Sequence, residues 1–147
     1  MGAYWVYQCD WDKSRPASGV ESTWGAQHIT VAVTPGEILR VPPSDYCIDK
    51  THNLEVLVLY ATPERVTLKY TREDDVLRGY TLHLEGLCVD PALVALYEQA
   101  DGAGRSQLPA LQAGQAFARA RMHALGISTR DSGAWMDPRH CADWWRT

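Results

Sequence analysis

The fold is decided by two alternating stretches, RVTLKYT at residues 65–71 and GYTLHLE at residues 79–85. Successive side chains of a β-strand point to opposite faces of the sheet, so a two-residue period is typical of a half-buried strand. The apolar faces would carry Val66, Leu68 and Tyr70 in the first stretch and Tyr80, Leu82 and Leu84 in the second. The charged residues 72–77 between them indicate a hairpin loop. We therefore predict two antiparallel strands.

Further short β-rich segments lie on both sides of this hairpin. They cover residues 4–8, 28–33, 37–41, 53–60, 115–121 and 125–130. The segment 53–60 is nearly continuously apolar, as in a strand buried on both faces. Residues 10–25 are polar and predict a loop. Short strands separated by turn residues predict a mostly β fold, either a small barrel or a sandwich of antiparallel strands.

One α-helix is expected as an insertion between these strands, from Pro91 to about Ala100. Asp90 suits the N-cap and Pro91 the first helical position. The apolar stripe of this helix would consist of Leu93, Val94, Leu96 and Tyr97. Gly102 and Gly104 would end the helix.

Composition indicates one ordinary globular domain over residues 1–147, with 46% hydrophobic and 22% charged residues. The net charge is −4 and the basic residues are scattered, which argues against a nucleic-acid partner. The longest apolar run, residues 54–61, is far shorter than the roughly 20 residues of a membrane span. No signal peptide is recognised among the first residues.

The four cysteines, Cys9, Cys47, Cys88 and Cys141, form no C-x-x-C pair, so zinc ribbons and thioredoxin-type motifs are not indicated. We predict buried free thiols, with a disulfide between Cys9 and Cys47 as the alternative. Cys88 lies between two apolar residues and is expected to be buried and inert.

Two segments share a local pattern, VTPGEIL at residues 33–39 and LQAGQAF at residues 111–117. Each places a glycine between an apolar approach and an apolar exit. This similarity suggests two related β halves that close on each other.

These turns resemble those of the lysostaphin-type (LytM-like) zinc endopeptidases, whose domain is a duplicated β barrel. Residues 36–39 resemble a "GTPV"-like turn of that family, and residues 111–118 resemble its "V-x-x-GQ-x-IG" turn. Residues 80–84 resemble its "Y-x-HL" strand with a shift of one residue. A closing run over residues 125–138, ending in Asp137-Pro138, extends the resemblance to about residues 26–138. The helix is an insertion relative to the family.

The resemblance also shows departures at the zinc site. The family's ligand positions fall on Ala26, Thr30, Ala124 and Gly126, and none of these side chains can bind zinc. Only His83 falls on a functional position, that of the histidine that assists catalysis. The resemblance therefore implies a non-catalytic binding domain for a cell-wall glycan, a peptide or a protein partner, with no cofactor and a secreted or cell-envelope location.

The alternative is a hydrolase of the metal-dependent peptidase or amidase type, with a relocated site around His83. The sequence therefore leaves enzymatic activity open but favours the binding domain over an enzyme. An enzyme with unrelated chemistry on a similar barrel is a third possibility. Zinc would then require His28, His83 and His123 to converge through the fold, because the sequence contains no zinc-binding histidine motif.

Candidate site residues follow from the same strands. His83 and Glu85 share one strand face and could act as an acid–base pair, and Asp131 could lie beside His83 if their strands are neighbours. Trp5 and Tyr7 would share a face of the first strand. Together with Tyr80 and Trp135, they could form an aromatic platform on which a sugar ring stacks.

Overall fold

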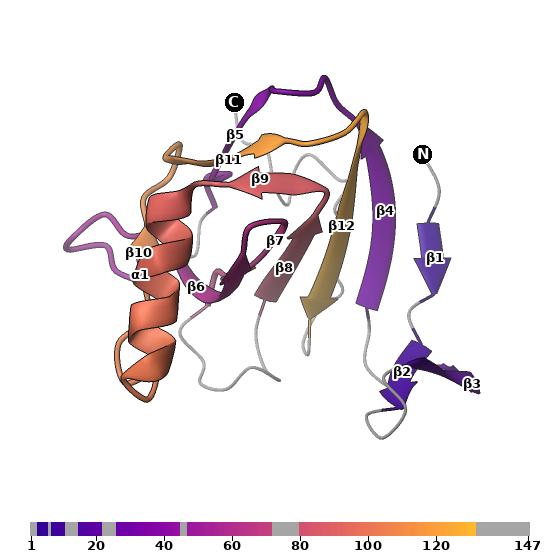
Figure 1. Cartoon of the computed structure of the whole chain (residues 1–147). Coiled ribbons are helices and arrows are strands. Elements are labelled where there is room, and N and C mark those ends of the chain that lie inside the picture. The colour runs from indigo at the N-terminus through magenta and orange to yellow at the C-terminus, as the bar shows by residue number, and fades with distance from the viewer. Residues whose placement is uncertain are drawn as a thin grey trace.

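The computed structural model describes residues 3–5, 7–10, 15–21, 26–44, 47–71 and 80–131. For residues up to 27 and for residues 130–131, this description covers the backbone alone. The fold is mostly β, as predicted, with antiparallel sheets and one helix in the described part of the chain (Figure 1).

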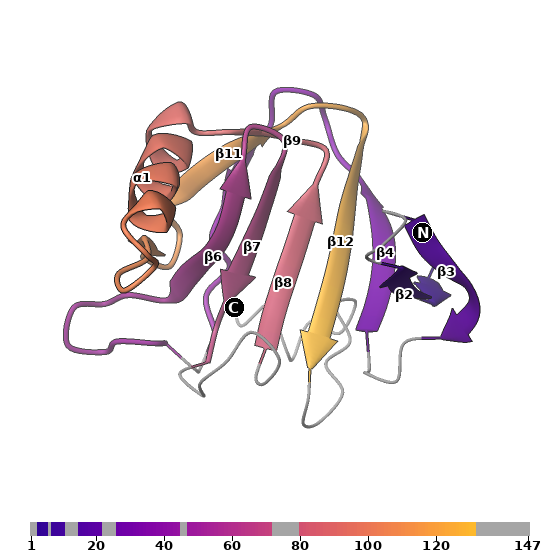
Figure 2. The same ribbon diagram turned by 60° about the horizontal axis from the view of Figure 1, so that its bottom comes forward.

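A seven-stranded antiparallel sheet forms the largest element (Figure 2). Its strands, in spatial order, are β1 (Ala3–Trp5), β4 (Ala26–Ala32), β12 (Ala124–Asp131), β8 (Tyr80–Glu85), β7 (Arg65–Lys69), β6 (Val56–Thr62) and β10 (Ala110–Leu111). Strand β12 lies between β4 and β8 and pairs with both. The predicted hairpin is therefore the pair β7–β8 at the centre of the sheet.

Two smaller sheets and a helix complete the fold. The three-stranded sheet has the order β5 (Ile38–Arg40), β11 (Ala116–Ala120) and β9 (Leu87–Val89), and the two-stranded sheet pairs β2 (Tyr7–Asp10) with β3 (Arg15–Glu21). Helix α1 (Pro91–Gly102) packs along β6 and runs two residues beyond the predicted end. The described strands form a small sandwich-like arrangement and no closed barrel.

The hydrophobic core lies on one face of the seven-stranded sheet, under the three-stranded sheet and α1. Its most completely buried side chains are Leu68, Leu87, Val41, Val56, Val58, Val66 and Tyr70. Asp90 caps α1 as predicted, because its carboxylate accepts the amide N–H of Ala92 at 2.9 Å. Leu96 was expected in the core stripe but is 52% exposed, so α1 contacts the core along a narrower stripe than predicted.

Gly36 and Gly114 stand at the centre of the two turns that were similar in sequence. Both have positive φ, +85° and +73°, a conformation that glycine adopts without strain. The N–H of Gly36 donates to the carbonyl of Ala120, and the N–H of Gly114 donates to the carbonyl of Val41. The turns lead into β5 and β11, which pair with each other. The structure thus places the two turns in equivalent, reciprocal positions.

The N-terminal segment differs from the prediction. Residues 15–21 form β3 where a loop was expected, and the expected strand over residues 4–8 is divided between β1 and β2 in different sheets. Pro16 and Gly19 are residue types that are rare in strands, so the sequence of residues 15–21 did not indicate β3.

The cysteine predictions also need correction. Cys88 is exposed on β9 although it was expected to be buried. Cys47 is a half-buried free thiol whose Sγ donates to the carbonyl of Leu54 at 3.2 Å. The alternative disulfide between Cys9 and Cys47 is therefore wrong.

Candidate functional site

His83 belongs to a row of polar and aromatic residues that crosses five strands. The register pairs Tyr60 of β6 with Thr67 of β7, Thr67 with His83 of β8, His83 with Ser128 of β12, and Ser128 with His28 of β4. Residues directly opposite each other in an antiparallel sheet project from the same face. We call this set the histidine row, and the sheet face that carries it the polar face.

Two hydroxyl groups fix the two imidazoles of the histidine row. The Oγ1 of Thr67 lies 2.8 Å from Nδ1 of His83, and the Oγ of Ser128 lies 2.6 Å from Nδ1 of His28. Each distance is a hydrogen bond, and its direction depends on the histidine tautomer. Both rings are therefore held in defined orientations.

Gly126 makes room for the site beside the histidine row. It lies opposite Glu85 in the register. A Cβ atom at this position would lie 2.7 Å from Cγ of Glu85 and 3.1 Å from Cε1 of His28. The first contact is closer than real Cβ atoms come and the second is tight, so the Glu85 side chain, and to a lesser extent that of His28, uses the space that a larger residue would fill.

A pocket of about 210 Å³ opens on the polar face. Its lining residues are Tyr60, Arg65, Val66, Thr67, His83, Leu84, Glu85 and Ser128. It therefore contains both members of the predicted acid–base pair, His83 and Glu85, which are exposed. The alternation of residues 65–71 also places Arg65 and Thr67 on one face, opposite to that of Val66. Ser128 and Tyr60 were missed, because the register between strands is not readable from a single strand.

The remaining predicted site residues lie elsewhere. Asp131 is on the strand next to His83, as its prediction required, but it pairs with Tyr80, three positions along β12 from Ser128. Tyr80 is partly buried and packs against the core. Trp5 lies on β1 and Tyr7 on β2.

The side chains of Trp5 and Tyr7, and the whole of Trp135, are outside the described residues. The aromatic platform therefore stays a prediction.

The three histidines considered as zinc ligands are spread along the sheet. His28 and His83 flank Ser128 on either side. His123 is exposed just before β12, and its carbonyl accepts the N–H of Val33. Within the described ranges, no three His, Cys, Asp or Glu side chains lie close enough together to hold a metal ion.

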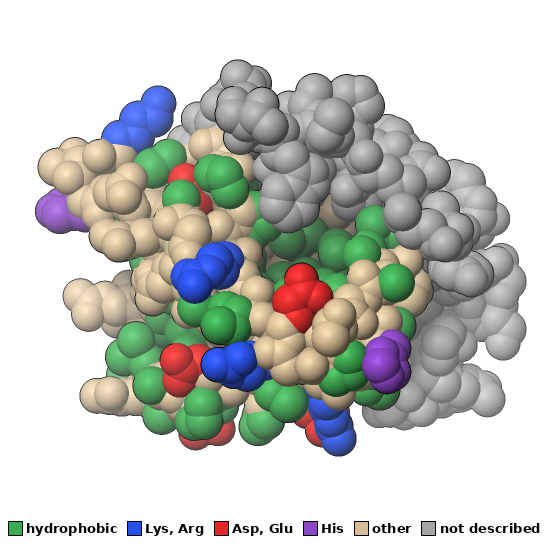
Figure 3. Space-filling model, turned by 90° about the horizontal axis from the view of Figure 1, so that it is seen from above, with side chains coloured by type: hydrophobic (Ala, Val, Ile, Leu, Met, Phe, Trp, Pro, Cys, Tyr) green, Lys and Arg blue, Asp and Glu red, His purple; other side chains and the backbone are tan. Residues whose placement is uncertain are grey.

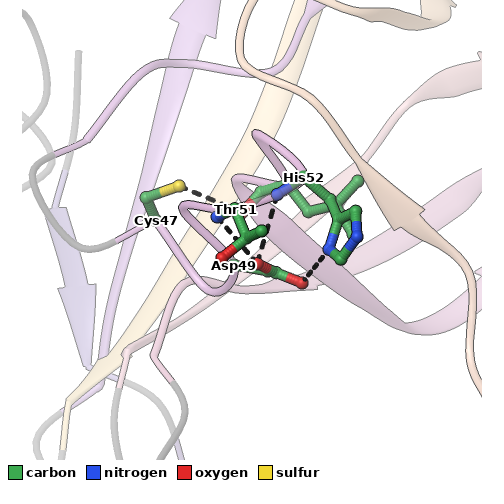
Figure 4. A network of polar contacts seen from close by, with 5 residues as sticks. Cys47, Asp49, Thr51 and His52 are labelled. Carbon is green, nitrogen blue, oxygen red and sulfur yellow. Dashed lines mark hydrogen bonds and ion pairs between the residues drawn. The ribbon is translucent and has the colours of Figure 1, made fainter.

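A second polar cluster stabilises the loop between β5 and β6 (Figure 4). The carboxylate of Asp49 accepts the backbone N–H groups of Thr51 and His52, and it lies 2.7 Å from Nδ1 of His52. The hydrogen bond from the His52 side chain lowers the pKa of Asp49 below its usual value. All of these contacts close one turn, so we interpret the cluster as structural.

Glu55 and Tyr70 form a third polar group, inside the fold. The buried Glu55 carboxylate accepts hydrogen bonds from the backbone N–H of Ser44, at 2.7 Å, and from its hydroxyl. The Tyr70 hydroxyl donates to the carbonyl of Pro42 at 3.2 Å. Burial raises the pKa of Tyr70, and the charge of Glu55 raises it further. These contacts satisfy buried polar atoms, so we interpret the group as structural.

A larger pocket, about 410 Å³, lies against the three-stranded sheet. Its lining is mainly apolar, with Arg119 and the Cys88 thiol as the principal polar side chains beside the capping residue Asp90. The guanidinium of Arg119 already donates to the carbonyl of Gly36 at 2.9 Å. This pocket therefore offers fewer convergent polar groups than the smaller one on the polar face.

Acidic and basic side chains are interspersed on the face drawn in Figure 3. None of the helices in the described part of the chain is long and apolar enough to cross a membrane. No family model matches the chain, and no curated protein or solved structure is significantly similar to it.

Proposed function

We propose that this protein is a binding module whose ligand occupies the pocket on the polar face. The ligand classes implied by the resemblance are a cell-wall glycan, a peptide or a protein partner. The observation that supports the proposal is the pocket itself, where His83, Glu85 and Ser128 converge beside the half-exposed ring of Tyr60. A few placed polar groups beside an aromatic ring are typical of ligand sites.

The position of the pocket favours binding over acyl transfer. A serine or water nucleophile needs donors aimed at the developing oxyanion, which are often free backbone N–H groups. Ser128 and His83 lie within paired strands, where backbone N–H groups are used in the ladders. Among the described residues, the strands that line this pocket therefore offer few free backbone donors for a transition state.

The test is a titration of isotope-labelled protein with chitin oligosaccharides and with short peptides. We expect saturable shifts of the backbone amides at residues 66–67, 83–85 and 128. The variant His83→Ala should bind at least tenfold more weakly. His123→Ala is the matched control, because His123 is exposed and lies outside the pocket. Shifts confined to the three-stranded sheet would contradict the proposal.

A hydrolase centred on His83 is the second candidate function. The presence of His83 and Glu85 in one pocket, with Ser128 opposite His83 in the register, is the observation that favours it. This candidate predicts that His83→Ala abolishes turnover while the variant remains folded. In its metal-dependent form, it also predicts stoichiometric zinc in the purified protein. Unchanged turnover in His83→Ala would eliminate His83 from this role.

A further inference from the structure

Two opposite charges face each other at the pocket without forming an ion pair. Arg65 of β7 and Glu85 of β8 are directly opposite in the register, and both are exposed. In the part of the chain that the structure describes, the ion pairs join other side chains. These pairs are His52–Asp49, Arg105–Asp101 and Arg121–Glu64. The pocket therefore presents one cation and one anion, each available to a ligand.

We propose that the pocket recognises a zwitterionic group, in which an ammonium and a carboxylate are separated by a few atoms. The inference rests on the binding role proposed for this pocket, and it replaces the ligand classes implied by the resemblance with a free α-amino acid. The planar guanidinium of Arg65 would bind the carboxylate through two parallel N–H donors. The carboxylate of Glu85 would accept the ammonium protons.

The size of the pocket supports a ligand of this kind. A volume of 210 Å³ corresponds to the space of about seven liquid water molecules. Such a space accommodates one amino acid and is too small to enclose an oligosaccharide. The other lining groups suit the remainder of an amino acid, because Thr67 and Ser128 carry hydroxyls and Tyr60 supplies an apolar wall.

Tyr60 is itself held in place for this contact. Its ring is 44% exposed and meets the ring of Tyr97 on α1 edge-on, with 5.9 Å between the ring centroids. Such an arrangement is favourable for an aromatic pair and fixes one side of the Tyr60 ring. The exposed remainder of the ring is left for the ligand side chain.

A direct ion pair between Arg65 and Glu85, which the structure does not show, would compete with this ligand. Exposed ion pairs are weak and are screened by salt, so a ligand that satisfies both charges at once can replace such a pair. A ligand with one charge would satisfy one side chain and leave the other unpaired. Both charges of the ligand are therefore needed for tight binding.

The experiment compares L-phenylalanine, N-acetyl-L-phenylalanine and L-phenylalaninamide in titrations of the full chain, followed by amide shifts. We expect saturable shifts at residues 66–67, 83–85 and 128 with the zwitterion, and at least tenfold weaker binding of both capped forms. Equal binding of the three compounds would overturn this inference. If none of the three binds but an oligosaccharide or longer peptide binds at the same residues, the inference fails and the proposed function stands.

Variants of Arg65 and Glu85 test which side chain binds the carboxylate of the ligand and which binds its ammonium group. Arg65→Gln should remove the preference for the zwitterion over the amide, and Glu85→Gln should remove its preference over the N-acetyl form. Arg121→Gln is the matched control, because Arg121 pairs with Glu64 outside the pocket. The double variant Arg65→Glu and Glu85→Arg should still bind the zwitterion, with the carboxylate and the ammonium group of the ligand in exchanged positions. Preferences unchanged in both single variants would overturn the inference, and dispersed spectra would confirm that each variant is folded.

Discussion

The two faces of the β7–β8 pair differ in how evenly their side chains are buried. On the core face, Val66, Leu68 and Tyr70 are at most 1% exposed, and Leu82 and Leu84 of β8 are buried beside them. On the polar face, exposure changes along the strands, from the exposed Arg65 at one end to Lys69, which is 5% exposed, at the other. The core face is uniform because it fills one hydrophobic cluster. The polar face is graded, and its pocket lies at the open end.

The largest difference between the faces should appear on truncation of a side chain. Leu68→Ala should lower the free energy of unfolding by about 3 kcal/mol, because it leaves a cavity in a closely packed core. Arg65→Ala, three residues away on the polar face, should change it by less than about 0.5 kcal/mol. Urea denaturation followed by circular dichroism measures both values. Similar losses for the two variants would show that the polar face is packed as tightly as the core.

Alkaline pH should selectively weaken the core face through Tyr70. Burial raises the pKa of Tyr70 in the folded protein above its usual value of 10.0. Its contribution to stability is therefore complete below pH 10 and is lost as pH rises, because the unfolded chain releases the proton first. The free energy of unfolding should fall by up to about 1.4 kcal/mol for each pH unit above 10.

Tyr70→Phe is the control for this pH dependence. It removes the hydroxyl and its hydrogen bond to the carbonyl of Pro42, so it should cost about 1 kcal/mol at pH 7. Above pH 10, its stability should decline less steeply than that of the original protein. Parallel curves would assign the alkaline effect to other groups.

The buried end of the polar face contains an unsatisfied hydroxyl. Thr81 is 3% exposed, and its Oγ1 has no hydrogen-bond partner in the described part of the chain. Thr81→Val keeps the shape and removes the desolvated oxygen, so it should raise the free energy of unfolding by about 1 kcal/mol. Thr67→Val should lower it by a similar amount, because the Thr67 hydroxyl bonds to His83. Destabilisation by both variants would reveal a partner for Thr81.

The smallest effect on stability should come from Gly126→Ala. The new methyl group would press mainly on the flexible Glu85 side chain, so stability should change by less than about 1 kcal/mol. The ring resonances of His28 should nevertheless shift, because Cε1 of His28 lies 3.1 Å from the new atom. Gly102→Ala, which adds a methyl in open space, should leave these resonances unchanged. Unshifted His28 resonances in Gly126→Ala would contradict the described packing.

The core strands were predictable because the apolar residues at every second position mark the face that enters the core. Residues 65–71 alternate since one of their faces enters the core, and β7 and β8 appear where the pattern places them. β9 and β10 span three and two residues, which is too short for a period to be recognised. β3 contains Pro16 and Gly19, so local propensity opposed the pairing that the tertiary structure imposes.

From the sequence, residues of the candidate site could be grouped only when they lie on the same strand. Alternation grouped His83 with Glu85 and Arg65 with Thr67, because neighbours at a spacing of two share a face. His28 and Ser128 are 100 positions apart in sequence, and their contact depends on the register between β4 and β12. That register is set by tertiary pairing, for which a single sequence offers no periodic signal.

The place of β12 in the large sheet has a consequence for the order of synthesis. Among the described strands, β4 has β1 and β12 as its neighbours, and β12 connects it to β8 and the strands beyond. On a nascent chain, β4 can therefore pair with β1 but cannot join the rest of the large sheet until residues 124–131 have emerged. Pairing at such sequence separation is slow, and unpaired strand edges can join other chains in the meantime. Mutations that weaken β12 should then reduce the yield of native protein more than their effect on equilibrium stability would suggest.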